Sequence, residues 1–89
     1  MDDSIDELLE VLSLSNEGAT TFVGRGSGHE GYGLFGGHQL AQSIVSAYRS
    51  VSAERRLHSV HGFFLRGGDG NKNINYDVAN IRDGRAFCQ

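Results

Sequence analysis

Apolar residues follow two periods along the chain, and the helical period appears first. Near the start, apolar side chains recur at the spacing of one helix face: Ile5, Leu8, Leu9 and Leu12. Ser4 and Glu7 fit a capping box, the reciprocal pair of side chains that begins many helices. Residues 5–13 are therefore predicted to form a short amphipathic helix with Ser4 as its N-cap.

A longer apolar stripe at helical spacing follows in the middle of the chain: Leu40, Ala41, Ile44, Val45, Tyr48 and Val51. Polar residues fill the other side, so residues 38–51 are predicted to form a helix with one strongly buried face. Gly36 and Gly37 come just before it, where the first N–H groups of the helix lack intrahelical partners. Such a terminus can receive an oxyanion or a phosphate. Alternatively, the two glycines only let the helix pack tightly on a sheet.

The second period is that of β-strands. Residues 20–23 are β-branched and aromatic, which predicts a short strand. Residues 57–65 carry apolar side chains at odd and even positions, which predicts a strand buried on both faces. Residues 74–79 alternate apolar and polar side chains, as a half-exposed strand does.

The turn signals arrange these elements into one fold class. Asp83-Gly84 is a strong two-residue hairpin signal, so residues 85–89 are predicted to return as an antiparallel strand. Because the helix and the hairpins segregate along the chain, we predict an α+β fold. The helix at 38–51 is expected to lie across one face of an antiparallel sheet.

The glycine-rich stretch between the first strand and this helix contains GSGHEG at residues 26–31, which fits the dinucleotide-binding pattern G-x-G-x-x-G. In that fingerprint the glycines open the helix directly. Here three more glycines precede the stripe that starts at Leu40, and the acidic residue expected about 20 positions on is missing. The pattern therefore favours a connecting loop, and no Lys follows Gly36-Gly37 as a P-loop would need.

Composition removes several other classes of protein. With 89 residues the chain is at most one domain, and its net charge of −3 gives no basic footprint for nucleic acid. No apolar run approaches the roughly 20 residues of a membrane span. Cys88 is the only cysteine, which excludes an internal disulfide and fits a reducing compartment. The acidic start resembles no secretory or transit peptide, so we expect a cytoplasmic protein, or a peroxisomal one in a eukaryote.

Three successive segments, LFGGHQLAQSIVSA, LHSVHGFFLRGGD and INYDVANIRDGRAF, resemble the acyl-CoA thioesterase II family. The resemblance covers nearly all of the chain and implies a hotdog fold, in which curved antiparallel sheet wraps a central helix. It implies that residues 1–89 form the N-terminal part of the first of two hotdog repeats, incomplete in this chain. It also implies hydrolysis of acyl-CoA to a free fatty acid and CoA. The sequence departs from the family at His38, usually Gln, and at Gly67, usually Pro.

The resemblance places the family's catalytic Asp, hydroxyl residue and Gln in the second repeat, so none is carried onto this chain. In the chain itself, His58 is the candidate catalytic side chain; the alternative is a core histidine bonded to backbone. Candidate substrate-binding residues are Gly36, Gly37, His38, Gln42 and Arg66. The last of these could meet a CoA phosphate or, alternatively, form a surface turn with Asp69.

No metal or cofactor is expected. His58 and His61 are three positions apart on a predicted strand and would point to opposite faces. His29 and His38 lie in or near the glycine-rich loop without clustered cysteines or carboxylates.

Two functional hypotheses remain, with dinucleotide binding a distant third. The first is an acyl-CoA thioesterase whose catalytic trio lies in a second hotdog repeat. The second is a non-catalytic hotdog fragment that serves as a pairing or acyl-binding module. In both, the expected partners are acyl-CoA and a second hotdog, either another copy or a second repeat.

The 89 residues alone are predicted to self-associate or aggregate, because the strand that begins at Arg85 has an unpaired edge. The apolar stripe of the helix at 38–51 would also be incompletely covered. Analytical ultracentrifugation over a range of concentrations checks this. A monomer at every concentration, with one sharp unfolding transition, would contradict it.

Overall fold

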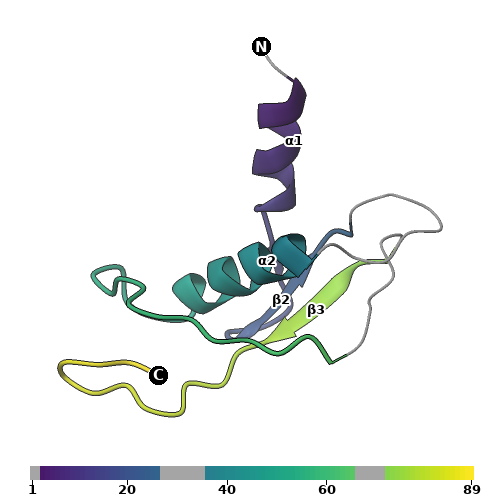
Figure 1. Ribbon diagram of the computed structural model, residues 1–89. Helices are drawn as coiled ribbons and strands as arrows, with labels where there is room; N and C mark the ends of the chain where they lie inside the picture. Colours follow the sequence, from purple (N-terminus) through teal and green to yellow (C-terminus); the bar gives the residue numbers. More distant parts are fainter. Residues whose placement is uncertain (1–2, 27–35, 66–71) are drawn as a thin grey trace.

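The computed structural model of the chain describes residues 3–26, 36–65 and 72–89 (Figure 1). Its elements in order are α1 (Asp3–Val11), β1 (Ser15–Asn16), β2 (Thr21–Gly24), α2 (Gly36–Arg49) and β3 (Ile74–Asp77). The sheet order is β1-β2-β3, and β2 pairs antiparallel with both neighbours. Helix α2 lies across one face of the sheet, while α1 extends away from it (Figure 1). The predicted α+β class is confirmed.

The centre of the sheet lies beneath α2, and Arg49 at the C-terminal end of that helix contacts it. Phe22 of β2 is fully buried and pairs with Tyr76 of β3. The Arg49 guanidinium lies 5.0 Å from the centre of the Phe22 ring, within the range of a cation–π contact. Arg49 also donates to the Leu14 carbonyl at 2.5 Å and to the Asn16 side chain. The last turn of α2 is thereby tied to both β1 and β2.

Helix α1 differs from the prediction at its start. It begins at Asp3, so Ser4 lies inside the helix and is not its N-cap. The apolar face is more than half exposed, at Ile5, Leu8 and Leu9. The missed strand β1 follows α1 closely; its two polar residues, Ser15 and Asn16, carry no apolar alternation that could have indicated it.

Helix α2 also differs from the prediction, in its bounds and in its buried face. It begins at Gly36 and ends at Arg49, so both glycines form part of its first turn instead of preceding it. Its fully buried residues are polar, Gln42 and Ser46, whereas its predicted apolar stripe is only half-buried and Tyr48 is exposed. The polar side is buried because it is the side that packs against β2.

The strand predicted at residues 57–65 is wrong for this structure. The segment is irregular and exposed along its length; Leu65 is 90% exposed and Phe63 79%. An apolar pattern on both faces indicates burial between neighbouring elements. Among the described strands, however, β3 pairs with β2 alone. The segment instead follows α2, where the Leu57 N–H donates to the Tyr48 hydroxyl at 2.7 Å.

Strand β3 covers Ile74–Asp77 and is shorter than the predicted strand at 74–79. The chain reverses further on, but the strand predicted at 85–89 does not form, and the reversal is held by one isolated bridge. Asp83 pairs with Cys88, and the Gly84 N–H donates to the Phe87 carbonyl at 2.7 Å. The loop of this hairpin is therefore Arg85-Ala86 and not Asp83-Gly84.

The shift of the hairpin has a visible cause in Arg55. Its guanidinium donates to the Asp83 carboxylate at 2.7 Å and to the Gly84 carbonyl. These contacts hold the two residues as part of the paired segment, so the turn forms two residues later. The possible surface turn of Arg66 with Asp69 and most of the glycine-rich loop lie outside the described residues.

Candidate functional site

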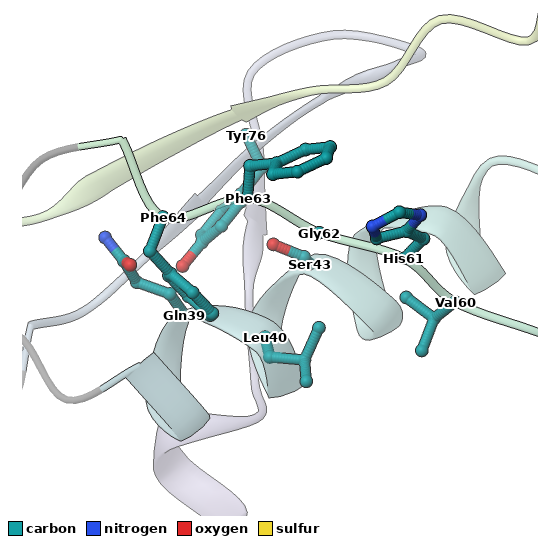
Figure 2. Close-up of a pocket in the computed structure, with 9 residues that line it drawn as sticks. All are labelled: Gln39, Leu40, Ser43, Val60, His61, Gly62, Phe63, Phe64 and Tyr76. Carbon is teal, nitrogen blue, oxygen red and sulfur yellow. The ribbon is translucent and has the colours of Figure 1, made fainter.

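A pocket of about 320 Å³ lies between α2, the segment 60–64 and β3 (Figure 2). Its lining comes from three parts of the chain: Gln39, Leu40 and Ser43 of α2, Val60, His61, Gly62, Phe63 and Phe64 of the segment, and Tyr76 of β3. This volume falls at the lower end of the range for small-molecule sites in proteins.

The chemistry of the lining is mostly apolar. None of the nine residues is Asp, Glu, Lys or Arg. Burial raises the pKa of Tyr76 to about 12, so its hydroxyl is neutral at physiological pH. That hydroxyl donates to Gln42 Oε1 at 2.7 Å, away from any ligand, and leaves the ring to line the pocket. The arrangement suits a hydrocarbon better than an ion.

Gln42 is the polar centre beneath the pocket. It is fully buried, and its Nε2 donates to the Val11 carbonyl at 2.8 Å and to the Arg25 carbonyl at 3.0 Å. Its Oε1 accepts the Tyr76 hydroxyl. One carboxamide therefore joins the end of α1, the end of β2, α2 and β3. Both of its N–H groups are used within the chain, so contact with a substrate would require breaking one of these bonds.

Gly24 provides the room for this carboxamide. An added Cβ at Gly24 would lie 2.6 Å from Gln42 Cδ and 2.8 Å from Nε2, closer than unbonded atoms approach. A side chain at this position would therefore require the buried Gln42 carboxamide to move.

The structure brings together some of the predicted site residues at the start of α2. Phe64 covers Gly36, since an added Cβ there would lie 3.4 Å from Phe64 Cζ, and Gly37 is exposed. His38 Nε2 lies 2.8 Å from the Arg25 carbonyl, the same oxygen that accepts from Gln42. The predicted substrate contacts of these residues stay predictions.

The histidines of the segment are placed differently from each other. His61 lines the pocket and His58 does not. Both are exposed, so the alternative of a core histidine at position 58 is wrong in this structure. Arg66, Asp69 and His29 lie outside the described residues. Within the ranges that the structure describes, no group of three or more His, Cys, Asp or Glu side chains could hold a metal ion.

None of the predicted site residues that the structure describes lines this pocket, and none of its nine lining residues was predicted as a site residue. Gln39 and Ser43 are four positions apart, hence neighbours on one helix face. Their spacing alone indicates that they share a helix face. Which face of α2 meets the sheet and which meets the pocket follows only from the burial of Gln42, which no local pattern reveals.

The chain matches a known family over most of its length. Residues 25–89 match the family described as acyl-CoA thioesterase N-terminal domain. Acyl-CoA thioesterase 2 of Haemophilus influenzae is 34% identical over 87 residues, 98% of this chain and 30% of the relative. Human acyl-coenzyme A thioesterase 8 is 36% identical over 77 residues, 86% of this chain and 24% of the relative.

The fold agrees with a solved structure. The tesB protein of Mycobacterium avium subsp. paratuberculosis superposes with a TM-score of 0.83 at 35% identity, over 90% of this chain and 32% of that one. The α+β fold is therefore hotdog-like, with α2 as its central helix. The chain belongs to the acyl-CoA thioesterase family, as the resemblance implied, and spans about a third or less of the length of these relatives. None of the described helices is long and apolar enough to cross a membrane.

Replacing Gln42 is predicted to weaken the contacts of α2 with the end of α1, at Val11, and with the end of β2, at Arg25. Gln42→Leu leaves the Val11 and Arg25 carbonyls and the Tyr76 hydroxyl without this partner, at about 1–3 kcal/mol for each group that stays buried. Urea unfolding of the full-length protein measures the loss. Gln39→Leu, on the pocket side of the same helix turn, is the control, with an expected change within about 0.5 kcal/mol. Equal effects of the two substitutions would contradict the assignment.

Gly24→Ala is predicted to destabilise the protein through the same carboxamide, because the new methyl group overlaps it. Gln42→Ala removes the overlapped atoms. The double variant should therefore lose clearly less stability than the sum of the two single losses. Additive losses in urea unfolding would show that the two residues act independently.

The Tyr76 hydroxyl is predicted to titrate near pH 12 in the folded protein and near 10 when unfolded. The unfolded state then loses its proton first, so stability is unaffected below pH 10 and falls between pH 10 and 12. Ultraviolet difference titration of wild type against Tyr76→Phe isolates this phenol. A Tyr76 transition near pH 10 in the folded protein would refute the prediction.

Proposed function

We propose that the protein to which these residues belong hydrolyses acyl-CoA thioesters to a free fatty acid and CoA. The observation that carries the proposal is the family match over residues 25–89. The matched relatives are named as acyl-CoA thioesterases or, in Saccharomyces cerevisiae, as a peroxisomal acyl-coenzyme A thioester hydrolase that is 31% identical over 84 residues. The weakly polar pocket beside α2 supports the same substrate class.

Within this proposal, the described residues supply a substrate-shaping half. Thioester hydrolysis needs a base or polar groups that orient water, and donors directed at the developing oxyanion. The family's Asp, hydroxyl residue and Gln are assigned to a second hotdog repeat, which would pair with this one. The pocket of this half would hold part of the acyl group, while Gly36, Gly37, His38 and Arg66 stay candidates for contacts with the thioester or CoA.

The test is release of the CoA thiol from a series of acyl-CoA substrates by the full-length protein. Steady hydrolysis of at least one acyl-CoA is the expected result. The residues 1–89 alone are expected to release none above background. A full-length protein that binds acyl-CoA but releases no thiol would favour the alternative, a non-catalytic acyl-binding or pairing module.

His58 is tested in the same assay. If it acts as a general acid or base, His58→Ala lowers kcat by about 100-fold or more. His61→Ala is the matched control three positions on, and as a pocket residue it should change KM more than kcat. A kcat for His58→Ala within twofold of wild type would remove His58 from the chemistry.

A further inference from the structure

The pocket owes its shape to one position of the segment that covers α2. Val60 and Phe64 extend toward α2, whereas Phe63 extends from the other side of the segment (Figure 2). Gly62 lies between Val60 and Phe64 and above Ser43 (Figure 2). Each neighbour of Gly62 on this side is large, and Gly62 has no side chain, so the space between them stays open toward α2.

The packing around Gly62 does not require a glycine. An ideal Cβ built on Gly62 meets no atom within 4 Å, and its φ lies outside the left-handed region that favours glycine. Gly24 and Gly36 differ, because an added Cβ would touch Gln42 or Phe64 there. A side chain at position 62 would therefore meet no close contact, and Gly62 is one of the residues that line the pocket.

We propose that Gly62 determines specificity: its missing side chain opens the pocket to the hydrocarbon part of an acyl group and limits how long that part can be. This inference rests on the proposed function and assigns the acyl chain, not the phosphates of CoA, to the pocket. The described lining supports this, since its nine residues include no carboxylate, ammonium or guanidinium group. The phenol of Tyr76 is turned toward Gln42, so the wall it presents is mainly its ring.

The length of the bound chain is what a side chain at position 62 would change. Each buried methylene group contributes roughly fourfold in affinity. A leucine side chain in the open space displaces the outer groups of a long acyl chain and leaves a short one untouched. Displacing two methylene groups would therefore lower binding of the long chain by about 10- to 20-fold.

The experiment measures kcat/KM of the full-length protein for butanoyl-CoA and dodecanoyl-CoA. In Gly62→Leu we expect the ratio of kcat/KM for dodecanoyl-CoA to that for butanoyl-CoA to fall by about tenfold or more. Gly18→Leu is the matched control, because an added Cβ at this glycine also meets nothing within 4 Å and it lines no part of the pocket. Its ratio should equal that of wild type.

Ser43→Leu fills the same space from α2 and should lower the ratio in the same direction, whether or not Gly62→Leu folds. An unchanged ratio in a folded Gly62→Leu or, if that fails to fold, in Ser43→Leu, would overturn the inference and leave the proposed function intact. Calorimetry with dodecanoic acid separates a failure of this inference from a failure of the proposed function. One outcome is that the wild type binds dodecanoic acid but hydrolyses no acyl-CoA, and that Gly62→Leu binds it about tenfold more weakly. That outcome would support the acyl-binding role of the pocket and refute the proposed hydrolase activity. Equal binding by both would overturn the acyl site.

Discussion

The arrangement of the described elements depends on one buried carboxamide, that of Gln42. A buried amide is costly unless its donors and acceptor are all bonded, and here both N–H groups and the oxygen have partners. Those partners come from the end of α1, the end of β2 and the middle of β3. Moving any of these elements would leave a polar group unpaired in the interior, so the carboxamide fixes their positions together. Gly24 is the matching constraint on the backbone, since any side chain there would fill the same space.

The same constraint orients the pocket. With Gln42 and Ser46 turned to β2, the helix presents Gln39, Leu40 and Ser43 to the segment that follows it. The bond from Tyr76 to Gln42 also removes the most polar group of β3 from the pocket wall. The hydrogen-bond network of Gln42 and Ser46 therefore lies on the β2 side of α2. The apolar part of the pocket lining comes mainly from the segment 60–64 and from the Tyr76 ring.

Much of the fold was predictable from local patterns, and the failures share one cause. The two helices, the strand at 20–23 and the strand in 74–79 follow from periodicity, which is a property of nearby residues. The prediction of a strand at 57–65 was wrong because its apolar pattern indicates burial between neighbouring elements, and the described sheet supplies no such neighbours. Gln42 was assigned to the polar side of its helix because no local signal reveals that three distant groups satisfy it. The pocket was missed for the same reason, since Gly62 and Tyr76 meet α2 only in the folded chain.

The sequence separation of these bonds has a consequence for synthesis. Gln42 is 31 residues from Val11 and 34 from Tyr76. Each of these hydrogen bonds therefore closes a loop of more than 30 residues, which costs chain entropy. On the ribosome, α1, β2 and α2 emerge before the residue that completes the network. Until then the carboxamide oxygen must be hydrated, and α2 lacks the partner that holds it against β3. A pause in translation before Tyr76 would leave α2 bonded to the ends of α1 and β2, through Gln42 and Arg49, but without its hydrogen bond to β3.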